Sequence, residues 1–170
     1  SSDLNAYCAE WFTPHAAVRE TIFEEIKSRV QETDESVPVR KGPWWYVGRT
    51  EEGKSYGIHC RGASREQATE HVLLDENAEA DGHEYFALGA FDVSLSGGLL
   101  ASSRDLDGSE EYDLRIRNLV TGVDLADRIE RTYYGTAWSA DDNWLFYTVP
   151  DDQMRPYQLW RHRVGTAQAD

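Results

Sequence analysis

Apolar residues recur every three or four positions near the start of the chain, in two separate stripes. The first stripe consists of Leu4, Tyr7, Cys8, Trp11 and Phe12, and the second of Val18, Ile22, Phe23, Ile26 and Val30. This spacing predicts two amphipathic helices. Between them, Thr13 is the predicted N-cap of the second helix, and Pro14 is its first helical residue. Pro38 prevents the second helix from extending further. Each helix has an apolar face with few partners nearby, so we expect both to cover another surface.

From Gly42 onward the apolar period changes to two, which is typical of half-buried strands. The predicted strands cover residues 44–48, 56–60, 72–74, 85–93, 99–102, 112–119, 136–138, 144–149 and 157–164. Gly, Pro, Asn, Asp or Ser bounds each of them, a tight turn is predicted at 51–54, and 75–77 reads as a polar loop. The 6 Trp, 9 Tyr and 5 Phe also favour sheets over a small helical bundle.

The most informative pattern is an internal repeat, which appears when the chain is compared with itself at a shift of 45 residues. The coinciding pairs are Ser94/Ser139, Leu100/Leu145, Tyr112/Tyr157, Leu114/Leu159, Leu119/Val164 and Thr121/Thr166. A hairpin at 44–61 is a weaker third copy, in which Tyr56-Gly57-Ile58 echoes Tyr112-Asp113-Leu114. A repeat of about 40 to 50 residues built from short antiparallel strands is typical of β-propeller blades. The alternative is a chance likeness between two hairpins.

The sequence therefore predicts a mainly β protein in two parts. Residues 1–36 form an N-terminal helical extension, and residues 37–170 form the first two to three antiparallel blades of a partial β-propeller. Gly42 to Asp170 is shorter than three repeats of 45 residues, whereas a closed ring needs about four blades or more. We therefore expect the chain to be the front part of a larger protein. Its unpaired sheet edges make self-association an expected property.

Charge restricts the possible partners. The formal net charge is −14 and the chain has no cluster of Lys and Arg, which argues against nucleic acid and against an anionic membrane surface. Seven acids and no Lys or Arg occur between Glu66 and Glu84. This stretch is either a solvated acidic loop or a docking surface for a basic partner or cationic substrate.

Cysteine usage and the lack of targeting patterns bear on location. Cys8 and Cys60 are far apart and match no metal or redox spacing. The printed sequence contains no signal-peptide pattern and no apolar run long enough to span a bilayer. We expect a cytoplasmic protein, although a trimmed N-terminus would weaken the signal-peptide argument.

Several short matches to catalytic or metal-binding motifs lack the required context. Residues 53–57, Gly-Lys-Ser-Tyr-Gly, fit G-x-S-x-G, but they lie within a predicted hairpin rather than between a strand and a helix. His83-Glu84 lacks the second histidine of H-E-x-x-H, and Glu110 stands where the EF-hand-like start at Asp105 needs glycine. The five histidines are scattered. We therefore assign no catalytic, cofactor-binding or metal-ligating residue and expect no cofactor.

Several segments, taken in order, resemble one known family. They include Arg19–Arg29, Ser36–Tyr46, Arg49–Lys54, Leu73–Asn77, Asp107–Glu110, Phe146–Thr148, Arg155–Tyr157 and Trp160–Thr166. Together they resemble the N-terminal region of the prolyl oligopeptidase family, most closely its oligopeptidase B (protease II) group, over nearly the whole chain. One departure is Ser94-Leu95-Ser96-Gly97, where the family usually has S-P-D-G.

The resemblance implies a serine peptidase in which a seven-bladed propeller caps a C-terminal α/β-hydrolase domain with a Ser-Asp-His triad. It also implies cleavage of short peptides after Arg or Lys, and a helical extension that packs on the hydrolase domain. The triad would lie after the residues present, so this part would be non-catalytic and would gate access and dock on its hydrolase domain. The alternative is a stand-alone propeller-derived interaction module. A downstream reading frame that ends in G-x-S-x-G followed by Asp and His would favour the peptidase.

Overall fold

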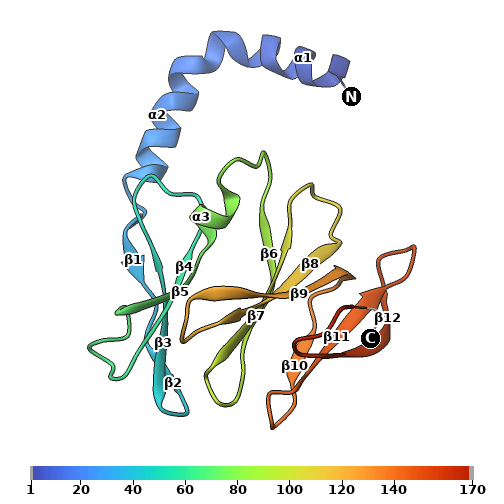
Figure 1. Cartoon of the computed structure of the whole chain (residues 1–170). Helices are drawn as coiled ribbons and strands as arrows, with labels where there is room; N and C mark the ends of the chain where they lie inside the picture. The colour runs from blue at the N-terminus through green and yellow to red at the C-terminus, as the bar shows by residue number, and fades with distance from the viewer. Residues whose placement is uncertain (1, 169–170) are drawn as a thin grey trace.

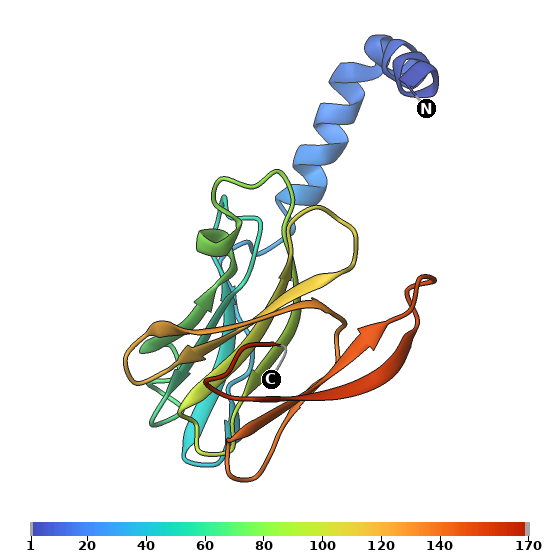
Figure 2. The ribbon, with the colours of Figure 1, turned by 45° about the vertical axis from the view of Figure 1, so that its right-hand side comes forward.

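The computed structural model describes residues 2–168 and shows a helical arm followed by three antiparallel sheets (Figure 1). The arm consists of α1 (Ser2–Phe12), the 3₁₀ turn η1 (Thr13–His15) and α2 (Ala16–Lys27). It stands away from the sheets in both views of the ribbon (Figures 1 and 2). The two predicted helices are thus present, with a break at Pro14 as expected. No helix in residues 2–168 is long and apolar enough to cross a membrane.

The three sheets are named blades 1 to 3 in chain order. Blade 1 contains β1 (Asp34–Glu35), β2 (Val39–Lys41), β3 (Trp44–Thr50), β4 (Ile58–Gly62) and β5 (His71–Asp75), followed by the short helix α3 (Glu76–Ala80). Blade 2 contains β6 (Ala87–Val93), β7 (Leu99–Asp105), β8 (Tyr112–Asn118) and β9 (Val123–Thr132). Blade 3 contains β10 (Thr136–Trp138), β11 (Trp144–Pro150) and β12 (Pro156–Arg163). Blades 2 and 3 follow chain order from edge to edge, and in blade 1 both β1 and β2 pair with β3.

The 45-residue repeat is confirmed in register, because β7 and β11 begin 45 residues apart. The same turn precedes both strands. The Ser94 hydroxyl accepts a hydrogen bond from the Leu99 amide at 3.2 Å, and the Ser139 hydroxyl accepts one from the Trp144 amide at 2.9 Å. Gly97 and its counterpart Asp142 both have positive φ, +77° and +57°. The sequence repeat therefore reflects repeated backbone geometry, as expected for propeller blades.

The weaker third copy is a hairpin, as predicted, but its register with blade 2 is not the one that the sequence suggests. Leu114 packs towards blade 3 in a cluster with Leu145. Ile58 instead packs within blade 1 beside Val47, and the next residue, His59, stacks on Phe91 of blade 2 with ring centroids 4.4 Å apart. Because neighbouring strand residues face opposite sides, Tyr56-Gly57-Ile58 is one residue out of step with Tyr112-Asp113-Leu114.

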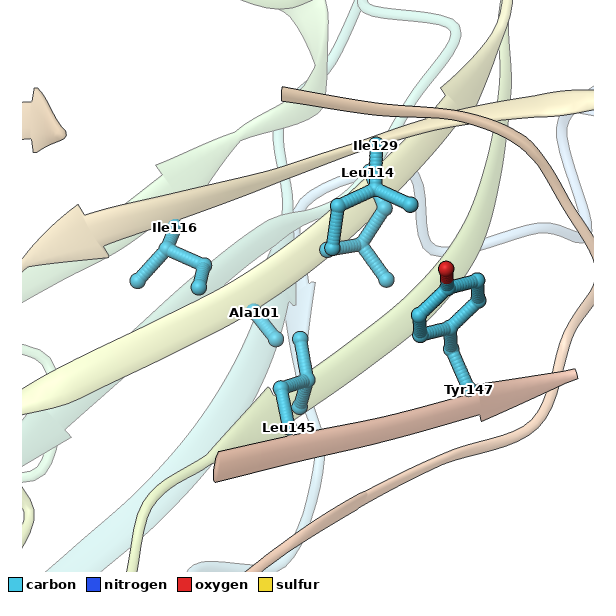
Figure 3. Close-up of a cluster of buried hydrophobic side chains, with 6 residues drawn as sticks. All are labelled: Ala101, Leu114, Ile116, Ile129, Leu145 and Tyr147. Carbon is cyan, nitrogen blue, oxygen red and sulfur yellow. The ribbon is translucent and has the colours of Figure 1, made fainter. Parts of the chain in front are cut away.

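The main apolar core lies between blades 2 and 3 (Figure 3). Its buried members are Ala101, Leu114, Ile116, Ile129, Leu145 and Tyr147. A second cluster, made by Leu73, Leu74, Val93 and Leu100, joins blades 1 and 2. The blades are therefore held face to face by the alternate strand positions that the period of two predicted.

Four elements were not anticipated, and one predicted cap is wrong. The largest omission is β9, whose apolar Ile129 is flanked by charged residues that hide the alternation. The short elements β1, β2 and α3 also fall in stretches with weak apolar patterning, and residues 76–77 belong to α3 rather than to a loop. The Thr13 hydroxyl donates back to the Ala9 carbonyl at 2.9 Å, so it closes the preceding helix and does not cap α2.

Candidate interaction surfaces

The arm exposes nearly all of its large apolar side chains. Their exposed fractions run from 39% for Phe12 to 67% for Leu4. The full set is Leu4, Tyr7, Trp11, Phe12, Val18, Ile22, Phe23 and Ile26, and Val30, just after α2, is exposed as well. A contiguous apolar surface of this kind commonly marks a site of interaction with another protein surface.

Local contacts explain how the arm keeps its shape without packing on the blades. Arg29 pairs with Glu25 one turn earlier, and the Arg19 guanidinium lies over the Phe12 ring, 4.8 Å from its centroid. The Trp11 and Phe12 rings meet edge to face with centroids 4.8 Å apart. The contact between Arg19 and Phe12 links α2 to α1 across η1, and the apolar stripes stay open.

The seam between blades 1 and 2 combines its apolar cluster with arginines. Arg61 is 5% exposed, donates to the Gly97 carbonyl at 2.6 Å and lies over the Trp44 ring at 4.2 Å. Farther along the seam, Arg117 donates to Asp124 at 2.6 Å and to Glu79 of α3 at 3.1 Å. These bonds, the one to Asp124 first, raise the pKa of Arg117 above its usual value.

The seam between blades 2 and 3 uses the repeated turn as a contact. The Asp142 carboxylate accepts from the backbone amides of Leu95 at 3.2 Å and Ser96 at 3.3 Å, in the equivalent turn of blade 2. The Trp138 indole donates to the Asp92 carbonyl at 3.0 Å. Trp138 of blade 3 therefore packs against blade 2 and has a structural role.

A buried ionisable pair crosses the same seam. The side chains of His162 and Asp127 are each 1% exposed, and His162 Nε2 lies 2.6 Å from Asp127 Oδ1. The Gly165 amide donates to the same oxygen at 2.7 Å. His162 lies 45 residues after Arg117, which likewise bonds to an acid of the preceding blade. In blades 2 and 3 the repeat therefore carries a basic residue at one position that bonds to an acid earlier in the chain, before its own blade, a signal that sequence reasoning missed.

The outer edge of blade 3 is open. Within residues 2–168, β12 has a strand on one edge and none on the other. Tyr157, Leu159 and Trp160 on this strand are 52–72% exposed. Tyr157 and Trp160 also line a hollow of about 710 Å³, which Glu130 and Arg131 of β9 border from blade 2. An unpaired edge with exposed apolar side chains is a site where another strand can add.

The acidic stretch of residues 66–84 is partly internal. Asp75 caps α3 by accepting from the Asn77 amide at 2.9 Å, and Glu76 lies 2.7 Å from His59 Nε2. Glu79 pairs with Arg104 and Arg117 across the seam. These three acids have partners within the chain, and Glu70 lies 4.0 Å from His71 Nε2, so a docking surface for a basic partner would rest on Glu66, Asp81 and Glu84.

The structure also places the motif-like residues. Ser55 lies in the turn between β3 and β4, with no helix following, so the context of a nucleophile elbow is missing. No hydrogen bond joins a serine hydroxyl to a histidine in residues 2–168. The same part of the chain contains no group of three or more His, Cys, Asp or Glu residues placed to hold a metal ion. Figure 2 shows sheets that lie beside one another, with the arm extending away from them. The candidate sites in residues 2–168 are therefore the interaction surfaces described above.

The family follows from a match over almost the whole chain. Residues 3–170 match the family described as prolyl oligopeptidase, N-terminal beta-propeller domain. This chain belongs to the prolyl oligopeptidase family. The partial propeller and its helical extension, predicted from the repeat and the resemblance, are thereby confirmed.

Two curated members of the family are similar in sequence. Protease 2 from Moraxella lacunata is 36% identical over 169 residues, which cover 95% of this chain and 24% of that protein. Dipeptidyl aminopeptidase BI from Pseudoxanthomonas mexicana is 33% identical over 178 residues, which cover 95% of this chain and 25% of that protein. The chain therefore spans about a quarter of the length of these relatives.

Solved structures of the prolyl oligopeptidase family agree with the fold. Oligopeptidase B from Leishmania major has a TM-score of 0.89 at 27% identity, over 97% of this chain and 24% of that chain. Oligopeptidase B from Trypanosoma brucei, in a closed form with covalently bound antipain, has a TM-score of 0.85 at 30% identity, over 97% and 23% of the two chains. This chain corresponds to the N-terminal propeller part of such peptidases.

Proposed function

We propose that the chain is the non-catalytic part of an oligopeptidase B-like serine peptidase that hydrolyses short peptides after Arg or Lys. Its role is to gate access of peptides and to dock on an α/β-hydrolase domain. Family membership, the 36% identity to Protease 2 and the likeness to two oligopeptidase B structures support this proposal. So does the quarter-length coverage of these relatives, which leaves room for a catalytic domain.

The exposed stripe of the arm is the observation that carries the docking role. An amphipathic helix normally buries its apolar face against a partner surface. Here Trp11, Ile22 and Ile26 are 51–60% exposed, while the side chains at the blade seams are nearly fully buried. A hydrolase domain that covers the arm would remove this surface from water.

The peptidase assignment can be tested with an Arg-containing fluorogenic peptide. We expect no turnover by the 170-residue chain and turnover by the full-length gene product. Turnover by the short chain that Ser55→Ala abolishes would overturn the non-catalytic assignment. If the reading frame lacks a hydrolase part, the stand-alone interaction module replaces this proposal.

The docking role needs a separate experiment in the full-length protein. Trp11→Ser with Ile22→Ser should weaken the contact between the arm and the hydrolase domain, seen as faster proteolytic cleavage between the two parts. Glu20→Gln on the exposed, polar side of α2 is the matched control and should not change the cleavage rate. An unchanged rate in the double variant would contradict docking through the arm.

The proposal extends to self-association of the isolated chain and to a cytoplasmic location. The open edge of β12 and the apolar arm both favour contact between copies, and light scattering that shows only monomer at high concentration would contradict it. Cys8 is a free, exposed thiol, as reducing compartments allow. Cell fractionation that finds the protein outside the cytoplasm would contradict the location.

A further inference from the structure

The arm joins blade 1 through a short segment, residues 28–33, named here the strap. After α2 ends at Lys27, the Val30 amide donates to the Lys27 carbonyl at 3.0 Å, and β1 begins at Asp34. Both ribbon views show the arm leaving the blades at this point (Figures 1 and 2). The strap is therefore where the direction of the arm relative to the propeller is determined.

Three hydrogen bonds attach the strap to the blade, and all of them reach the end of β3 or the β3–β4 turn that follows it. The Thr50 hydroxyl donates to the Glu32 carbonyl at 2.7 Å, and the Glu52 amide donates to the Thr33 hydroxyl at 3.1 Å. The Gly53 amide donates to Glu32 Oε2 at 3.3 Å. The strap is thus held at one point of blade 1.

The Glu32 carboxylate also reaches back to the helix. Its second oxygen, Oε1, lies 3.5 Å from Nζ of Lys27, the last residue of α2. The Glu32 side chain is 26% exposed although it lies in a segment that is otherwise open. One carboxylate therefore bridges the end of the arm and the turn of the blade.

The neighbouring charged groups make no such bridge. Arg29 of the strap pairs with Glu25 of α2 and does not reach the blade. Asp34 accepts from the Glu35 amide and from Gln31, within the strap and β1. Gly53 has a φ of +76°, a left-handed conformation that glycine adopts without strain and in which its amide meets Glu32. Among these groups, the Glu32 carboxylate is the one that contacts both the end of α2 and the turn of blade 1.

We propose that Glu32 is a hinge clamp that fixes the direction of the arm by holding Lys27 and the Gly53 amide at once. The inference rests on the proposed docking role, because a fixed direction would present the apolar stripe in one orientation. An exposed ion pair and one side-chain hydrogen bond are weak interactions in water. The clamp therefore favours one direction of the arm. Its weak bonds break when contact with a partner surface favours another direction.

The test is a distance distribution between spin labels on the arm and on blade 2. Labels are placed at Glu20→Cys and Val120→Cys, both exposed, in a Cys8→Ser background, while the buried Cys60 stays unlabelled. We expect one narrow distribution in the parent chain and a broad, shifted one in Glu32→Ala. Lys27→Gln should broaden it less, because the bond to Gly53 remains.

Glu52→Gln is the matched control, since it removes a charge from the same turn while its backbone amide still bonds to Thr33. It should leave the distribution unchanged. A Glu32→Ala distribution that superimposes on the parent one, in a variant whose circular dichroism shows intact sheets, would overturn the clamp. An unchanged cleavage rate in the Trp11→Ser, Ile22→Ser variant, together with a distance distribution that Glu32→Ala does broaden, would instead overturn only the proposed docking role, so the two failures are distinguishable.

Discussion

The arm and the seam between blades 2 and 3 use the same kinds of side chain in opposite ways. At the seam, Leu114, Ile129 and Leu145 are completely buried, whereas Ile22 and Phe23 of the arm are 51% and 57% exposed. Apolar periodicity is clear in the sequence of α2, β8 and β11, and charged residues hide it only in β9. The difference teaches that periodicity reports which face of an element is apolar, while burial depends on whether a partner lies within the same chain.

The largest test of this contrast removes one apolar side chain from each region. Leu114→Ala should lower the free energy of unfolding by about 2 to 5 kcal/mol, because it leaves a cavity in a packed core. Ile22→Ala should change it by less than about 0.5 kcal/mol, because the side chain is half exposed and alanine favours helix. Urea unfolding of the 170-residue chain measures both. Equal losses would show that the arm packs on the blades in solution.

The second prediction concerns the polar link of the same seam. His162→Leu should cost about 2 to 3 kcal/mol, because Asp127 would remain buried with the Gly165 amide as its only partner described in residues 2–168. The double variant with Asp127→Leu should recover part of the loss, since an apolar pair often replaces a buried ion pair at little cost. If the single variant loses nothing, the pair contributes no net stability to the seam.

A third, smaller effect is expected at the repeated turn. Asp142→Ala loses the bonds to Leu95 and Ser96 and places alanine at a φ of +57°, which should cost about 1 to 2 kcal/mol. Asp142→Gly loses the same bonds without the backbone strain and should cost less. Gly97 already occupies this position in blade 2, so glycine is compatible with the turn. Equal losses for alanine and glycine would assign the whole effect to the carboxylate.

Much of this architecture could be read from the sequence, for physical reasons that particular elements make plain. The period of two identified β7 and β11, and the repeat of 45 residues aligned them correctly, because equivalent strands meet equivalent neighbours. β9 was missed because its outward positions are charged and only a few inward ones are apolar. The boundary between residues 36 and 37 stays a prediction, although β1 already pairs with β3 at Asp34–Thr50.

The interaction surfaces were less predictable than the fold. The exposed stripe of the arm followed from the sequence, since two helices were predicted with no partner. The pair His162–Asp127 did not, because it joins residues 35 positions apart whose contact depends on how two blades face each other. The Glu32 bridge likewise depends on the turn at Gly53, 21 residues later in the chain. Contacts of this kind leave no local pattern.

The smallest effect concerns pH at the turn of blade 3 that contacts blade 2. Bonds from the Ser139 hydroxyl and from Asn143 lower the pKa of Asp141 from 3.8 to about 2. A carboxyl with a lowered pKa stabilises the folded chain above the unfolded pKa, so this contribution is lost as pH falls from about 4 towards 2. Ser139→Ala should raise the pKa of Asp141 towards 3.8, measured by NMR titration of its carboxyl carbon, and Ser109→Ala in blade 2 should leave it unchanged. A titration midpoint near 3.8 in the parent chain would show that the hydrogen bonds of this turn are open in solution. This part of the seam would then resemble the arm, which has no partner within the chain.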